Sequence, residues 1–112
     1  MICDSWDVVI VPFPFTEKVG VKRRPALVLS TKTFNENGHL VLSMITTQAH
    51  AAWPGDTNIS SLPAAGLHAP CIVRLKVFTL DNRLIIRRSG HLAETDRKNV
   101  TLSLRRYVSS FA

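Results

Sequence analysis

The sequence predicts a mainly β domain, a small antiparallel barrel or curled sheet that ends in one C-terminal helix. Short apolar, β-branched runs follow one another between Pro, Gly and Asn residues, with no helical period between them. Only the end of the chain changes to a helical period. Because 112 residues leave no room for a second core, we expect a single domain over residues 1–112.

The expected strands are apolar runs bounded by turn residues. The first strand is expected over residues 7–12, where β-branched residues end at a proline. The others are expected over residues 25–30, 40–46, 58–62, 71–75 and 88–92. Loops or turns over residues 12–20, 35–38, 51–56 and 64–66 separate them.

The last segment predicts a helix. Five apolar residues fall at helical spacing and would form one stripe: Val100, Leu104, Tyr107, Val108 and Phe111. Acidic residues near the expected start and arginines near the expected end fit the helix dipole. We expect Thr95 to cap its N-terminus.

The early strands are apolar on nearly every residue, which indicates that both of their faces are covered. The C-terminal helix is one cover. A second copy of the chain is the simplest second cover, so we expect a homodimer. The alternative is a weakly patterned monomer.

The charge balance favours an anionic partner. Fourteen basic and eight acidic residues give a net charge of +6, which favours nucleic acid, although a solubilising surface explains the same excess. No apolar run approaches the roughly 20 residues of a membrane helix, and no signal-peptide pattern is present. Two cysteines, Cys3 and Cys71, are too few for a disulfide framework and fit a reducing cytoplasm.

The sequence lacks the usual patterns for metal and cofactor chemistry. The four histidines are scattered, the five glycines are isolated and the acidic residues form no paired motif. There is no Gly-x-Ser-x-Gly nucleophile motif either. We therefore expect neither a metal nor a cofactor.

Two polar segments remain as candidates for chemistry. Lys22-Arg23-Arg24 enters a strand just before a proline, and a guanidinium there can bind phosphate. Thr46-Thr47-Gln48 leaves the third strand with three hydrogen-bonding side chains. A solvated basic turn and ordinary strand-end capping are the alternative interpretations.

The two segments could form one site if their strands are neighbours in the sheet. The start of one strand then lies beside the end of the other, so Arg24 and Thr46 would converge on one phosphate. RNA carries its own nucleophile in the 2′-OH. Cleavage then needs a proton acceptor, a cation for the phosphorane and a donor for the leaving oxygen.

Six segments, in order, carry a recognisable pattern. They are WDVVIVPFPFT (6–16), KRRPALVLS (22–30), ITTQ (45–48), AGL (65–67), CIVRL with Thr79-Leu80 (71–80) and GHL (90–92). Their order and spacing resemble the MazF/PemK toxin family from about residue 6 to 110. The resemblance implies an SH3-like barrel and a homodimer. It also implies a sequence-specific, metal-independent endoribonuclease that cuts single-stranded RNA.

Members of this family are the toxins of type II toxin–antitoxin systems, so the resemblance implies a cognate antitoxin and contact with DNA only through the antitoxin complex. It implies catalytic roles for Arg24, which would stabilise the phosphorane, and Thr46, which would hydrogen-bond the scissile phosphate. The RNA-binding residues it implies are Thr16, Glu17, Lys22, Arg23, Thr47, Gln48 and Arg74.

The sequence departs from the family pattern at several positions. Trp6 replaces a usual glycine, while Thr16 and Lys76 replace a histidine and an acidic residue that some members use. The general base therefore stays open, with His50 as a chemical candidate.

Two alternatives to an enzyme stay open. One is a non-catalytic barrel that binds nucleic acid or protein, as a gyrase poison does, and the other is a decayed toxin that only binds its antitoxin. Retention of Arg24 and Thr46 favours the enzyme.

Overall fold

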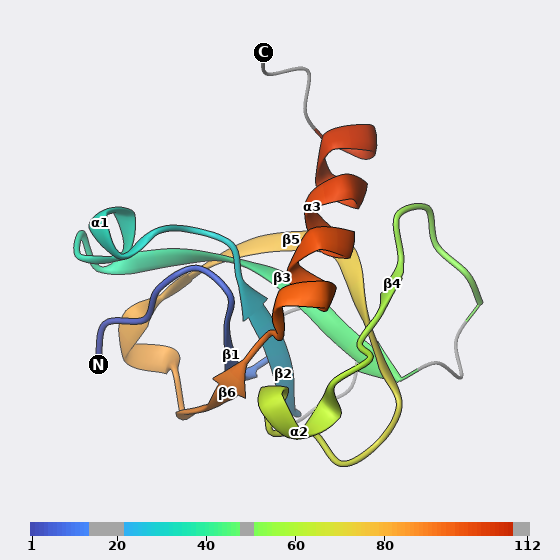
Figure 1. Ribbon diagram of the computed structural model, residues 1–112. Helices are drawn as coiled ribbons and strands as arrows, with labels where there is room; N and C mark the ends of the chain where they lie inside the picture. Colours follow the sequence, from blue (N-terminus) through green and yellow to red (C-terminus); the bar gives the residue numbers. More distant parts are fainter. Residues whose placement is uncertain (14–21, 48–50, 109–112) are drawn as a thin grey trace.

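The computed structural model describes residues 1–13, 22–47 and 51–108 (Figure 1). Six strands in these residues form one curled sheet in the order β4-β5-β3-β2-β1-β6, and every neighbouring pair is antiparallel. The strands are β1 (Asp7–Pro12), β2 (Arg23–Val28), β3 (His39–Thr47), β4 (Thr57–Asn58), β5 (Cys71–Asp81) and β6 (Arg87–His91). The expected mainly β class is confirmed.

Two strands differ from their expected bounds. β2 begins at Arg23, ahead of Pro25, because Pro25 faces Ile10 of β1 and the ladder to β3 starts only at Ala26. β5 continues to Asp81 beyond the expected end at residue 75. A register shift opposite Ser43 and Met44 interrupts its alternation of apolar and polar residues, and that alternation is the signal a sequence offers for a strand.

Two expected turns are preceded by single turns of helix, α1 (Lys32–Asn35) and α2 (Leu62–Ala65). Residues 58–62 are therefore not a strand beyond Asn58. α2 ends at Gly66, whose φ of +70° is left-handed, and a Cβ there would lie 2.1 Å from the Ser89 carbonyl oxygen. Helices of four residues are too short to show a helical period in a sequence.

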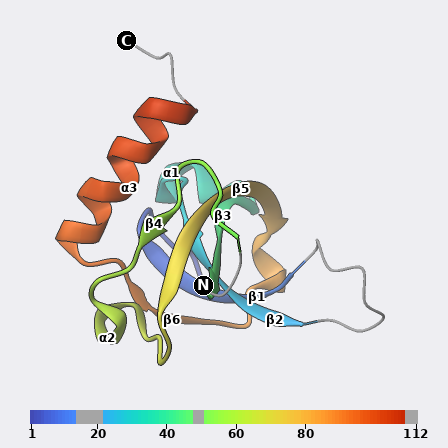
Figure 2. The same ribbon diagram turned by 90° about the vertical axis from the view of Figure 1, so that its right-hand side faces the viewer.

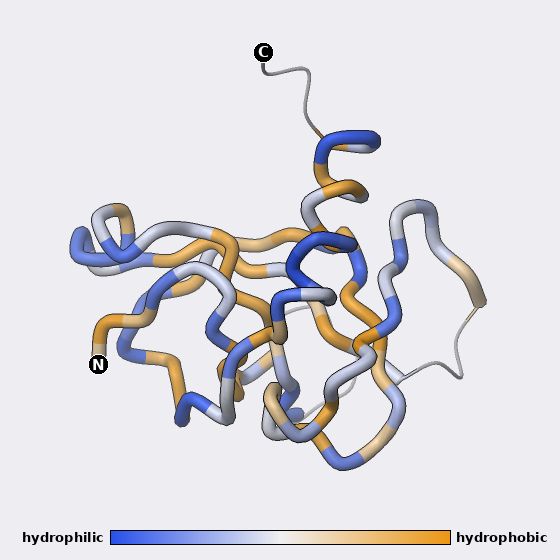
Figure 3. Tube along the Cα trace, in the orientation of Figure 1, coloured by the Kyte–Doolittle hydropathy of each residue, from blue (hydrophilic) through white to orange (hydrophobic). Residues whose placement is uncertain are grey.

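The sheet buries a core on each face. The core inside the curl contains Cys3, Val9, Val11, Phe13, Ala26, Val28, Leu40, Leu42 and Phe78. The core on the other face, under α2 and α3 (Glu94–Tyr107), contains Val8, Leu27, Ile45, Ile59, Ala65, Cys71, Val73, Leu92 and Val100. Figure 3 shows the hydrophobic stretches along the sheet and the hydrophilic ones in the connections. Two-sided burial thus arises within one chain, and a second copy is not needed to explain it.

α3 begins with Ala93 as its N-cap, so the expected cap at Thr95 is wrong. Val100 is buried and Leu104 packs against the core under the helix, as expected. Tyr107 and Val108 are 50% and 56% exposed, so the buried stripe stops short of them, and Phe111 lies outside the described residues. In both views the C-terminal half of α3 extends beyond the sheet, so these side chains lie outside the core under the helix (Figures 1 and 2).

No helix in the described part of the chain has the length and apolar character needed to cross a membrane.

Candidate functional site

Arg24 and Thr46 come together through the register of β2 and β3. These strands are neighbours, so the condition stated for the two segments is met, and Ala26 pairs with Met44. Continuing that register by two residues places Arg24 opposite Thr46. Alternate residues of a strand share a face, so both lie on the face of Ala26 and Met44, which pack into the core inside the curl.

Arg24 lies in the β1–β2 hairpin, near the end at which the two strands are connected. It faces Val11 of β1 and is half-buried, whereas Lys22 and Arg23 are exposed. The Phe13 N–H donates a hydrogen bond of 2.9 Å to the Lys22 carbonyl and fixes the two strands beside residues 14–21. Three consecutive cations therefore line one end of the sheet.

Thr46 brings a buried hydroxyl to the same face. The residue is 2% exposed, and its Oγ1 has no hydrogen-bond partner among the described residues. Buried hydroxyls in folded proteins nearly always have a partner. A buried hydroxyl of this kind, beside a cation, can bind a phosphate oxygen of a ligand. Thr47, the next residue, is exposed.

Arg74 lies on the same face but is already paired. It faces Met44 in the β3–β5 ladder and is buried. Its Nε and Nη2 donate hydrogen bonds to the Asp56 carboxylate at 3.1 and 2.9 Å, and Nη2 also donates to the Ala51 carbonyl at 2.8 Å. Arg74 therefore holds the segment before β4 in place, and its charge is largely neutralised by Asp56.

The ion pair sets the protonation of Asp56. Burial alone would raise the pKa of this carboxyl, but hydrogen bonds from the Arg74 guanidinium and the Trp53 N–H outweigh burial and lower it. Asp56 is therefore ionised at neutral pH.

The remaining predicted residues are not placed. Thr16, Glu17, Gln48 and His50 lie outside the described residues, so no contact to Arg24 or Thr46 is assigned to them. Sequence reasoning missed Trp53, whose ring lies 5.4 Å from the Arg74 guanidinium and 5.5 Å from Lys76 Nζ. A tryptophan beside Pro-Gly in an expected loop was the available signal.

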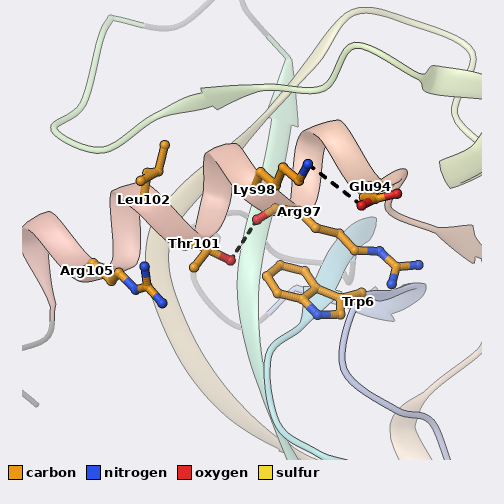
Figure 4. A pocket seen from close by; sticks show the side chains of 7 residues that line it. All are labelled: Trp6, Glu94, Arg97, Lys98, Thr101, Leu102 and Arg105. Carbon is orange, nitrogen blue, oxygen red and sulfur yellow. Dashed lines mark hydrogen bonds and ion pairs between the residues drawn. The ribbon is translucent and has the colours of Figure 1, made fainter. Parts of the chain in front are cut away.

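A groove of about 510 Å³ lies elsewhere, between Trp6 and α3 (Figure 4). The Trp6 side chain faces the helix there, and Arg97, Lys98 and Arg105 add positive charge. None of the described site residues lines this groove. Within the described ranges, no group of three or more His, Cys, Asp or Glu side chains is placed to hold a metal ion.

These features define a small, SH3-like curled sheet with a C-terminal helix and a basic site at one end. Residues 4–108 match the model of the family described as the PemK-like, MazF-like toxin of type II toxin–antitoxin systems. The chain therefore belongs to this toxin family, and the resemblance seen in the sequence is confirmed.

Solved structures share the fold at low sequence identity. MazE–MazF from Deinococcus radiodurans superposes with a TM-score of 0.74 at 19% identity and 97% coverage of both chains. An endoribonuclease in complex with its cognate antitoxin from a mycobacterial species gives 0.75 at 13% identity and 98% coverage of both chains. Mycobacterium tuberculosis toxin MazF-mt6 gives 0.71 at 17% identity, with 89% of this chain and 93% of that chain covered. No curated protein sequence matched the chain.

Proposed function

We propose that this family member is a metal-independent, sequence-specific endoribonuclease that cuts single-stranded RNA as the toxin of a type II toxin–antitoxin system. The observation that carries the proposal is the buried Thr46 hydroxyl, which has no partner in the described residues and shares a face with Arg24. Among proteins of this fold, one solved structure is described as an endoribonuclease with its antitoxin.

The proposed reaction is a transesterification within the RNA. The 2′-oxygen attacks the adjacent phosphorus, its proton passes to an acceptor, and the P–O5′ bond breaks as the 5′-oxygen takes up a proton. The products are a 2′,3′-cyclic phosphate and a 5′-hydroxyl. The Arg24 guanidinium stabilises the charge that grows on the phosphorane, and the Thr46 hydroxyl donates a hydrogen bond to a phosphate oxygen. No described residue is assigned as the proton acceptor.

The proposal extends to the partners of the chain. We propose a cognate antitoxin, a cytoplasmic location, a homodimer, and contact with DNA only through the antitoxin complex. Complexes of MazE with MazF share the fold of this chain and support the antitoxin partner. Leu102 and Tyr107 on α3 and Val108 at its C-cap expose apolar side chains that another protein chain can cover.

The test is cleavage of a mixed-sequence single-stranded RNA in EDTA, with the fragment ends mapped. We expect wild type to cut at a repeated short motif, and Arg24→Ala to lose cleavage while it keeps the fold. Loss of one such electrostatic group typically slows a reaction by about 10²- to 10³-fold. Persistent cleavage by Arg24→Ala would remove this arginine from the mechanism.

Thr46→Val is the sharper variant. Since Thr46 Oγ1 has no partner in the described part of the chain, the valine should leave the melting temperature unchanged or higher and still abolish cleavage. Thr46→Ser should keep cleavage. Thr57→Val is the matched control, because the buried Thr57 hydroxyl bonds to Ser103 Oγ at 3.1 Å. We expect this control to be less stable but active.

A binding-only barrel is the second candidate, and the open general base favours it, since Thr16 and Lys76 stand where some family members have a histidine and an acidic residue. RNA bound by wild type without any cuts in the same assay would support this candidate.

A further inference from the structure

We propose that Trp53 is a stacking platform for one unpaired base of the RNA, next to the site formed by Arg24 and Thr46. The proposal rests on the proposed function, because it assigns a subsite for the same single-stranded substrate. Aromatic side chains bind bases of any identity by stacking, since every base has a π-face.

The sheet register places Trp53 beside the site. Arg74 faces Met44, so it is a diagonal neighbour of Thr46 on the same face, at roughly 7–8 Å between such positions. The Trp53 ring centroid lies 5.4 Å from the Arg74 guanidinium carbon. A strand of RNA whose phosphate lies at Arg24 and Thr46 therefore reaches Trp53 with a neighbouring nucleotide.

The backbone of the loop holds Trp53 in one place. The Trp53 N–H donates to the Asp56 carboxylate at 2.9 Å, and the Asp56 N–H donates back to the Trp53 carbonyl at 3.1 Å. Asp56 is in turn fixed by Arg74. Gly55 has a φ of +83°, and a Cβ there would lie 2.5 Å from the Leu75 side chain, so the turn fits closely against β5. Binding would then need little reordering of the loop.

Trp53 is exposed and does not serve to fill a hydrophobic core. Trp53 is 41% exposed and belongs to neither core of the described chain, whereas Trp6, the second tryptophan, packs against the core under α3. The Lys76 ammonium lies over the Trp53 ring, 5.5 Å from its centroid, so the aromatic ring and positive charge for a flanking phosphate stand together. An aromatic side chain next to cations is the combination that single-stranded nucleic acid requires.

The test uses a short, fluorescein-labelled, mixed-sequence RNA with 2′-O-methyl groups, which removes the nucleophile and prevents cleavage. We expect Trp53→Ala to raise the dissociation constant by about 5- to 150-fold, the range found for loss of one stacked base. Trp53→Phe should restore most of the affinity, and Trp6→Phe is the matched control that should bind as wild type. Unchanged affinity in Trp53→Ala would overturn the proposal.

A second measurement needs no change at Trp53. In the Trp6→Phe variant, Trp53 is the only tryptophan of the chain. Its emission should fall when the RNA binds and should not change with the same RNA backbone made abasic. Trp53 emission that does not change when RNA binds would also overturn the proposal.

Normal cleavage of unmodified RNA by Trp53→Ala, with unchanged binding, would reject the stacking platform and leave the proposed function standing. A wild type that neither binds nor cuts RNA would reject both.

Discussion

Arg74 and Asp56 form a largely buried, bidentate ion pair that joins β5 to the loop before β4. The side chains are 9% and 16% exposed, and the shorter of the two hydrogen bonds measures 2.9 Å. The pair makes Arg74 a positioning residue for Trp53, because the same carboxylate accepts the Trp53 N–H. The placement of a residue beside the proposed RNA site thus depends on one ion pair.

We expect Asp56→Ala to lower the free energy of unfolding by about 3–5 kcal/mol, since it leaves the Arg74 guanidinium buried without its partner. The measurement is urea unfolding at neutral pH. Asp81→Ala is the matched control: Asp81 also lies 2.9 Å from an arginine, but that partner, Arg83, is exposed. Its removal should change stability far less. Equal effects of the two variants would show that burial does not strengthen the Arg74 pair.

We expect Asp96→Ala to destabilise the chain by about 2–4 kcal/mol. Asp96 is fully buried in the first turn of α3 and accepts hydrogen bonds from the Ser60 N–H at 2.9 Å, the Ser60 hydroxyl at 2.7 Å and the Ser61 N–H at 3.1 Å. These bonds hold α3 against the start of α2. The measurement is the melting midpoint, with Glu94→Ala as the control, because Glu94 is exposed in the same turn. A midpoint equal to that of the control would rule out this role.

The stability should fall in acid. Burial alone would raise the pKa of Asp96, but hydrogen bonds from Ser60 and Ser61 lower it, as Arg74 and Trp53 lower the pKa of Asp56. A lowered folded-state pKa contributes stability that is fully present above the unfolded value of about 3.9 and disappears as pH falls through the folded value. Thermal melts should therefore show a decline below about pH 4–5. The decline should be shallower in Asp96→Asn; an unchanged slope in that variant would contradict the assignment.

Replacement of Trp6 by glycine should destabilise the protein less than replacement by alanine. Its φ is +75°, a left-handed conformation held by hydrogen bonds of 2.8 Å from its N–H to the Val28 carbonyl and from the Leu92 N–H to its own carbonyl. Both Trp6→Gly and Trp6→Ala remove the indole from the core, but only glycine adopts this φ without strain. We expect the glycine variant to be more stable by about 1 kcal/mol in urea unfolding. A more stable alanine variant would show that the conformation relaxes.

RNA affinity should fall steeply with salt. Removing one phosphate-binding cation from a single-strand site reduces the slope of log affinity against log salt by roughly 0.7. Lys22 is exposed and directly precedes β2, so Lys22→Ala should show a reduction of about this size without a change in the melting midpoint. A wild-type affinity that is flat in salt would argue against a phosphate-binding site.

Much of the fold could be predicted from local patterns. The β-branched run before Pro12, the strand before Thr47 and the helix around Val100 all match the structure, because each has a period or a stop signal within a few residues. The short helix before Gly66 was missed, since a single turn shows no period. The exposure of Tyr107 was missed because a helical stripe does not reveal where the neighbouring sheet ends.

The sequence by itself determined the fold class, the location of most strands, the excess of positive charge and the family, and it marked Arg24 and Thr46 as candidates. Only the tertiary structure decided which side chains share a face. The β2–β3 register places Arg24 and Thr46 together, and the β3–β5 register adds Arg74. The pairing of Arg74 with Asp56 and the position of Trp53 depend on contacts across 18 and 21 residues of chain. Such contacts leave no local period in a sequence, because they are set by how the sheet curls and where its loops close.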